Sequence, residues 1–198
     1  MADSDRTGSR ASAAFLAWLL ALWLSCGVAV VVAAIAAFPS LAGKGVIVPG
    51  YEILVESGDS AASGRLAAGF VMDRVFAMTD LAQWILAPLA FLAAAWCWRR
   101  LRGCPGRKLA GFVMALAAAA LGLVLGHNLA IGPSMLVWLE EYRSLLLAGD
   151  LENALAVRDG FDAMHVLADR LYGLRMLLVA LALPLALLLP AAPAGGRA

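Results

Sequence analysis

The pattern of hydrophobic and polar positions is dominated by four long apolar stretches. The first has no charged residue between Ala11 and Gly43, and a membrane-spanning helix needs about 20 apolar residues. We therefore expect a first span at residues 15–38, which ends before Pro39. Three further spans are expected at residues 81–98, 109–131 and 171–189. Prolines inside the second and fourth stretches are compatible with this, because spanning helices tolerate them.

The first stretch has a competing interpretation as a cleaved signal peptide, because Arg6 and Arg10 precede it. A signal peptide has an apolar region of only about 7–15 residues, and this run is roughly twice as long. Residues 24–27 (Leu-Ser-Cys-Gly) faintly resemble a lipoprotein cleavage site, but residues 28–37 remain apolar instead of forming a polar tether. We interpret the stretch as an uncleaved anchor.

Three amphipathic segments flank these spans. Apolar residues recur at helical spacing over residues 66–76, 133–148 and 155–171, opposite acidic faces, which indicates helices. We expect them to continue spans two, three and four beyond the lipid and to pack together, with a turn at Gly149-Asp150. Helices lying flat on the membrane are the alternative, but those usually have polar faces rich in Lys and Arg.

The sequence therefore predicts an all-α fold: an integral membrane four-helix bundle with amphipathic helical extensions outside the membrane. We expect one membrane domain over residues 1–190 and a disordered tail at 191–198.

Composition supports this class. The chain is 63% hydrophobic and only 15% charged, whereas a soluble domain is about 45–50% apolar and about 25% charged. A single soluble domain of this size could not bury so much apolar surface. The net charge of +1 gives no support for nucleic-acid binding. The expected partner is the lipid bilayer.

The distribution of basic residues predicts the orientation of the spans. Lys and Arg concentrate in cytoplasmic loops. The short connection between spans two and three holds five basic residues and no acid: Arg99, Arg100, Arg102, Arg107 and Lys108. The two long connections, residues 39–80 and 132–170, are acidic. We expect this loop and both termini to be cytoplasmic, in the cytoplasmic membrane.

Small residues form a stripe along the third span, at Gly111, Ala115, Ala118, Gly122 and Gly126. The Gly122 and Gly126 pair matches the small-xxx-small pattern that lets two helices approach closely. The pattern favours packing inside the bundle, and a homodimer seam is the alternative.

Polar residues gather near the expected outer boundary. Five form a predicted cluster: Asp80, Gln83, His127, Asn128 and Arg175. An ionisable residue inside a span is a functional hypothesis with a partner to be named, and Asp169 or Asp80 is the expected partner of Arg175. The alternative is that Arg175 extends to the outer headgroups.

A second candidate site surrounds His165. Asp162 precedes it by three residues and Asp169 follows it by four, so all three share one helix face. Such a group could hold a divalent metal, although the spacing is common on solvated helices and a structural role for His165 is favoured.

No cofactor is expected. At about 1.5 Å per residue, His127 and His165 would differ by roughly 15 Å in height, too far for one haem. No nucleophile–base pattern or phosphate loop is recognisable either. We expect a non-enzymatic binding or interaction module, with a membrane-protein partner or a second copy. The alternative is a small transporter or metal-handling protein with a polar site at its outer mouth.

The arrangement resembles the bacterial members of the transmembrane-protein-205-like family, four-helix proteins carrying a domain of unknown function. The likeness covers about residues 20–185. It rests on Phe38-Pro39, on Ala67-Ala68-Gly69-Phe70 before Phe76, on Pro133 followed by Arg143, and on Phe161-x-x-x-His165. Ala168 and an enlarged loop at residues 44–60 depart from it. The resemblance implies an architecture and no particular activity.

Overall fold

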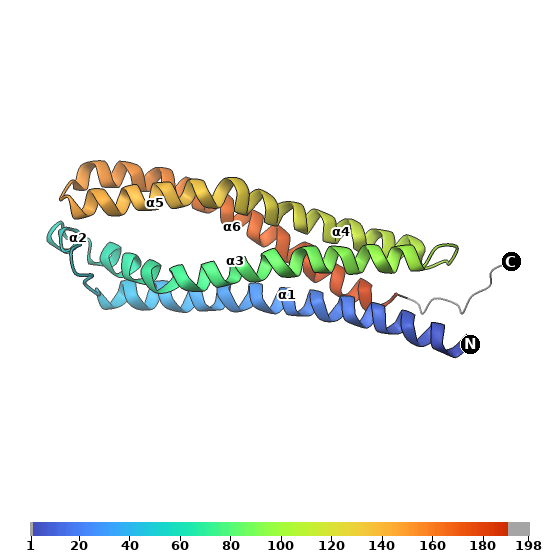
Figure 1. Cartoon of the computed structure of the whole chain (residues 1–198). Helices are drawn as coiled ribbons and strands as arrows, with labels where there is room; N and C mark the ends of the chain where they lie inside the picture. The colour runs from blue at the N-terminus through green and yellow to red at the C-terminus, as the bar shows by residue number, and fades with distance from the viewer. Residues whose placement is uncertain (1, 190–198) are drawn as a thin grey trace. The chain divides into compact units, whose positions relative to one another are not determined.

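The chain is built from helices alone over the part that the computed structural model describes, residues 2–189, with side chains from residue 10 onward. These residues contain no strand and are 88% helical. The elements, in chain order, are α1 (Ala2–Lys44), α2 (Ile53–Glu56), α3 (Ser60–Arg100), α4 (Arg107–Gly126), the π-helical η1 (His127–Ile131), α5 (Gly132–Leu147) and α6 (Leu151–Leu187) (Figure 1). The predicted all-α fold is confirmed, while the predicted tail at 191–198 lies outside the described residues.

Four helical stretches are long and apolar enough to cross a membrane: Arg10–Lys44, Ser60–Arg100, Arg107–Leu147 and Leu151–Leu187. Each is longer than the corresponding expected span, and the fourth ends two residues before the expected end at residue 189. The amphipathic segments are continuous with these stretches, as predicted.

Two prolines are accommodated differently from expectation. We expected Pro39 to end the first helix, but α1 continues through it to Lys44. A proline removes one backbone donor and frees one carbonyl, which a long helix with tertiary contacts can absorb. The third span was expected to end at residue 131, but the helix continues there through the π-helical η1, with Pro133 at the start of α5. A widened turn is a common way for a continuous helix to accept such a disturbance.

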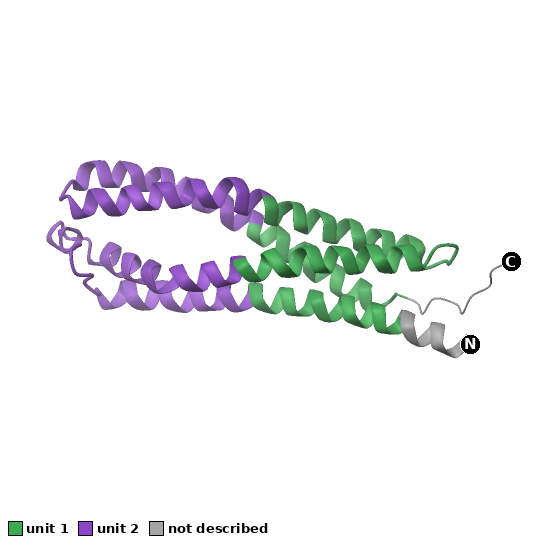
Figure 2. Ribbon diagram, viewed as in Figure 1, with its two compact units in different colours: residues 1–27, 81–125, 172–198 green, residues 28–80, 126–171 purple. Residues whose placement is uncertain are grey.

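The chain divides into two compact units (Figure 2). Unit 1 comprises residues 1–27, 81–125 and 172–198, and unit 2 comprises residues 28–80 and 126–171. The helices α1, α3 and α6 each contribute residues to both units.

Unit 1 is a four-helix bundle with an apolar core. Segments of α1, α3, α4 and α6 each supply buried side chains, among them Trp23, Ala90, Ala117 and Ala182. Alanine dominates three of the four faces, and small side chains let helix backbones approach closely. The same core contains Leu16, Leu20, Val113 and Val179, which fill the space between the backbones.

Unit 2 has a core of its own, formed by the amphipathic segments. It joins Tyr51 and Leu54, beside and within α2, to Leu66 of α3, Leu146 of α5 and Ala154 of α6. The predicted packing of these segments against one another is thereby confirmed. The α5–α6 connection turns at Gly149 (φ 79°), as predicted, and Asp150 accepts the backbone N–H of Asn153 in the first turn of α6 (3.2 Å).

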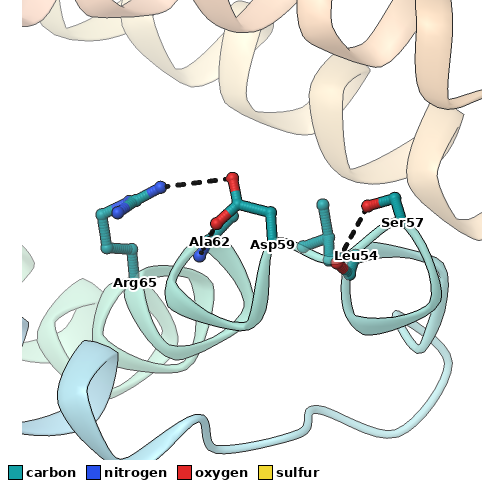
Figure 3. A network of polar contacts seen from close by, with 5 residues as sticks. All are labelled: Leu54, Ser57, Asp59, Ala62 and Arg65. Carbon is teal, nitrogen blue, oxygen red and sulfur yellow. Dashed lines mark hydrogen bonds and ion pairs between the residues drawn. The ribbon is translucent and has the colours of Figure 1, made fainter.

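Local polar contacts fix the start of α3 (Figure 3). Asp59 accepts the backbone N–H of Ala62 at 2.8 Å and lies 3.7 Å from the Arg65 guanidinium. A carboxylate in this position satisfies an N–H that the helix itself leaves unbonded. The Ser57 hydroxyl donates to the Leu54 carbonyl at 2.9 Å, within the short α2 turn.

Most of the small-residue stripe of α4, from Ala115 to Gly126, faces away from the bundle core. The buried face of α4 is Ala110, Val113, Ala117, Ala120 and Val124, whereas Gly122 and Gly126 are exposed. A Cβ added at either glycine would meet no atom within 4 Å. The packing expected at Gly122 and Gly126 inside the bundle is therefore not observed. The face of α4 that contacts the bundle core is the neighbouring one, which carries Ala117 and Ala120. A homodimer seam at Gly122 and Gly126 stays a prediction.

Close helix contact occurs at other glycines. In unit 2, a Cβ at Gly64 would overlap the Leu41 carbonyl oxygen and lie 2.6 Å from the Ala42 Cα. The backbones of α1 and α3 therefore touch at this point. In unit 1, Gly27 is covered by side-chain atoms of Met176 and Tyr172 of α6 rather than by a helix backbone.

We expect Gly64→Ala to lower the free energy of unfolding by about 1–3 kcal/mol, the usual cost of overpacking a rigid contact. Gly122→Ala is the matched control. It should be neutral or stabilising by up to about 1 kcal/mol, because alanine favours a helix over glycine. Unfolding of the purified proteins in detergent, followed by far-UV circular dichroism, measures both. Equal destabilisation of the two variants would contradict the close contact at Gly64.

Candidate functional site

The five residues of the predicted polar cluster are divided between the two units. Gln83 and Arg175 belong to unit 1, and Asp80, His127 and Asn128 to unit 2. Gln83 is 0% exposed and Arg175 is 1% exposed, whereas the other three are half-buried. Two of the five predicted residues therefore lie inside the unit 1 bundle, and these two form the candidate site described below.

The α1–α3 contact places a third buried polar group, the Trp23 indole, at about the height of Gln83. These two helices run antiparallel (Figure 1), and Phe15 and Leu92 line one groove between them. Trp23 is eight residues beyond Phe15 and Gln83 is nine residues before Leu92. At about 1.5 Å per residue, the two side chains are attached at nearly the same height. Trp23 is also 0% exposed.

The α1–α6 contact places Arg175 at the same end of the bundle. The Tyr172 hydroxyl donates a hydrogen bond to the Gly27 carbonyl at 3.0 Å. The guanidinium carbon of Arg175 lies 4.4 Å from the Tyr172 ring centroid, within the range of a cation–π contact. Gly27 is one helical turn from Trp23, so Arg175 is attached about one turn from the height of Trp23 and Gln83.

Gln83 and Trp23 contain buried polar atoms without hydrogen bonds to any described residue. These are both amide atoms of Gln83, Nε2 and Oε1, and the indole Nε1 of Trp23. Leaving such a group buried and unbonded costs about 1–3 kcal/mol, and over 90% of buried polar groups in proteins are bonded. The apolar core of unit 1 thus holds an unbonded indole N–H and an unbonded amide, together with a buried guanidinium about one helical turn away in height.

The region of His165 is an exposed helix face. His165 Nε2 lies 3.7 Å from the Asp169 carboxylate, and the His165 ring stacks on Phe161 with centroids 5.6 Å apart. The side chains of His165 and Asp169 are 45% and 71% exposed, and Asp162 is exposed as well. Among residues 10–189, no group of three or more His, Cys, Asp or Glu side chains could hold a metal ion. A metal site at Asp162, His165 and Asp169 stays a prediction without geometric support.

Unit 2 contains a charged contact that the sequence did not reveal. Arg143 of α5 donates to Asp73 of α3 at 2.9 Å, and its guanidinium carbon lies 4.2 Å from the Phe70 ring centroid. The Arg143 side chain is only 16% exposed. Phe70 also packs against Tyr51, with ring centroids 5.7 Å apart. The Phe70-x-x-Asp73 spacing, which puts both residues on one helix face, was the available signal, but it did not identify Arg143 as the partner.

Charge and burial oppose each other at Tyr142, in the unit 2 core. Burial raises the pKa of the Tyr142 hydroxyl, because the core disfavours the phenolate. The nearby guanidinium groups of Arg158 and Arg65 lower this pKa by a smaller amount. Tyr142 therefore stays neutral at physiological pH and acts as an apolar core residue with a polar end.

We expect Gln83→Met to raise the free energy of unfolding by about 1–2 kcal/mol, because it replaces an unbonded amide by an apolar group of similar volume. Leu86→Met, one turn further along α3 in the same core, should lower it by less than about 1.5 kcal/mol. Thermal unfolding in detergent compares the two. Strong destabilisation by Gln83→Met would show that the amide has partners within the folded chain.

Comparisons with known proteins add no relative: no family model matches the chain, and no curated protein or solved structure is significantly similar to it.

Proposed function

We propose that the chain is a multi-pass integral membrane protein that crosses a cell membrane four times. One observation carries this proposal: the apolar helices turn most of their surface outward. In the most apolar window of each stretch, only 22–33% of the residues are buried. Val32, Leu92 and Leu177 are 55–61% exposed. A bilayer is the solvent in which such surfaces are stable, because every backbone group is bonded within its own helix.

Charge and aromatic residues support an orientation with both termini in the cytoplasm. Arg100 lies 5.0 Å from the Trp96 ring and Arg107 lies 5.1 Å from the Trp98 ring, at the two sides of the α3–α4 turn. Tryptophan next to arginine is typical of the membrane–water interface, and clustered arginine of its cytoplasmic side. Unit 2, with its acidic residues, would then extend outside the cytoplasmic membrane.

We propose that the role is binding rather than catalysis, with unit 2 as the part that meets a membrane-protein partner or a second copy. Unit 2 has a hydrophobic core of its own, and the Asp73–Arg143 ion pair joins α3 to α5 within it. It also exposes apolar side chains on η1 and α5: Leu129, Leu136 and Val137 are 54–68% exposed. The resemblance to the transmembrane-protein-205-like family is part of this proposal. Phe70 and Arg143, two of its points of likeness, touch in the structure.

The orientation predicts which cysteines can be labelled from outside sealed cells. In a variant with Cys26 and Cys97 replaced by alanine, a membrane-impermeant maleimide should label Cys104, in the α3–α4 turn, only after lysis. Ser57→Cys, on an exposed position beside α2 and combined with Cys104→Ser, should be labelled in intact cells. The reverse pattern would invert the proposed orientation. Recovery of the chain in the soluble fraction without detergent would refute membrane insertion.

A second candidate function is transport or binding of a small anion, with Gln83 and Arg175 as the binding residues. The buried Arg175 and the unbonded amide of Gln83 favour it, because a charge inside a span is costly and usually serves a function. The guanidinium of Arg175 has only donors, so this residue would bind an anion in preference to a cation.

Under this second function, inorganic phosphate or sulfate should raise the thermal midpoint of the full-length protein in detergent. Saturating ligand at 100 times its Kd adds about 2.7 kcal/mol to stability. Gln83→Met should reduce this shift, and Leu86→Met should preserve it. Zinc tests the metal alternative: it should raise the thermal midpoint of the unmodified protein but not that of His165→Ala if His165 holds a metal. An equal anion shift in Gln83→Met and Leu86→Met, or none in the unmodified protein, would argue against the anion site.

A further inference from the structure

An apolar groove lies between α1 and α3 in unit 1, near the α3–α4 turn. Its volume is about 450 Å³, and its walls include Ala11 and Phe15 of α1 and Leu89, Leu92 and Trp96 of α3. Phe15, Leu92 and Trp96 are 52–61% exposed, so the groove is open along its length. Ligand pockets in proteins span about 300–1,000 Å³, and an apolar channel of this volume suits a single hydrocarbon chain.

One end of this groove is strongly basic. Trp96 forms its wall there, and the Arg100 guanidinium carbon lies 5.0 Å from the Trp96 ring centroid. Arg10, next to Ala11 in the sequence, and Arg99, next to Arg100, are exposed as well. The α3 side of the groove has no counter-charge in its own sequence, because residues 81–139 contain no Asp or Glu; the acids of α1 nearest to Arg10 in the sequence are Asp3 and Asp5. The groove therefore combines an apolar channel with several cations at a single end.

The other side of the same turn lacks this combination. Arg107 lies 5.1 Å from the Trp98 ring centroid, a pair similar to Arg100 and Trp96. However, Trp98 is directed at α4, where a Cβ added to Gly111 would be 3.3 Å from its Nε1. This pair has the same charge and ring but does not border the groove, so it serves as an internal control.

We propose that the groove binds one anionic phospholipid of the cytoplasmic leaflet. An acyl chain would lie along Phe15, Leu89 and Leu92, and the headgroup phosphate would pair with Arg100. Charge complementarity decides the occupant, because basic pockets between spanning helices on the cytoplasmic side attract anionic headgroups. The basic α3–α4 turn attracts anionic lipids without fixing where they lie. The groove, in contrast, would hold one lipid molecule at a defined position. This inference rests on the membrane insertion and orientation proposed above.

Quenching of tryptophan fluorescence by brominated lipids tests the proposal. The full-length protein is reconstituted in phosphatidylcholine vesicles containing an equal mole fraction of either dibrominated phosphatidylglycerol or dibrominated phosphatidylcholine. Bromine on the acyl chain quenches a tryptophan only at short range. We expect the anionic lipid to quench more strongly, and this excess should disappear in Trp96→Phe. Arg100→Gln should lower the preference for the anionic lipid about fivefold, because it removes the cation that pairs with the headgroup phosphate in the groove.

Arg107→Gln is the matched control and should leave the preference unchanged. Retention of the excess in Trp96→Phe, or equal losses in Arg100→Gln and Arg107→Gln, would overturn the lipid site. Equal quenching by both lipids would also overturn it while leaving membrane insertion intact. Absence of quenching by either lipid would refute the membrane proposal itself. If a helix of a second copy occupied the groove instead, it would shield Trp96 from both lipids. Trp96→Phe would then change the quenching by neither brominated lipid, and this result would also overturn the lipid site.

Discussion

The structure depends on one constraint: long helices that are apolar on nearly every side must satisfy their backbone groups internally and still find specific neighbours. Because the surfaces are uniformly apolar, hydrophobicity alone cannot select which faces meet. Close approach of small residues makes the selection instead. In unit 1 the seams are built from Ala90, Ala117 and Ala182, and in unit 2 the backbones of α1 and α3 touch at Gly64.

Polar groups inside unit 1 stand out against this background. The unbonded amide of Gln83 works against stability in a bundle that otherwise holds mainly aliphatic and small side chains. Proteins tolerate such costs mainly at positions that do something besides hold the fold. The Tyr172 hydroxyl, bonded to the Gly27 carbonyl, fixes α6 against α1 there and positions the helix turn that carries Arg175.

The two units use different chemistry for the same task of holding helices together. Unit 1 relies on close contacts between apolar side chains, as expected where lipid surrounds a bundle. Unit 2 adds polar fastenings. Asp73 and Arg143 join α3 to α5, Ser63 donates to the Val46 carbonyl at 2.8 Å, and Asp59 caps α3. Such contacts suit a region that meets water, where caps and ion pairs compensate for a smaller apolar core.

The sequence by itself determined the helical class, the four apolar stretches and the continuity of the amphipathic segments with them. These follow from local periodicity and length, which a single chain displays directly. The turn at Gly149 was also predictable, because only a residue without Cβ adopts its positive φ freely. The tertiary structure alone decided which face of each apolar helix turns inward. The pattern of small residues pointed to Gly122 and Gly126, but the core uses the adjacent face with Ala117 and Ala120. Likewise, sequence placed Gln83 and Arg175 near one boundary but could not show that both are buried, or that Trp23 is level with Gln83. Such facts depend on the rotation of one helix relative to another, and a helix that is apolar all round carries no local signal for that rotation.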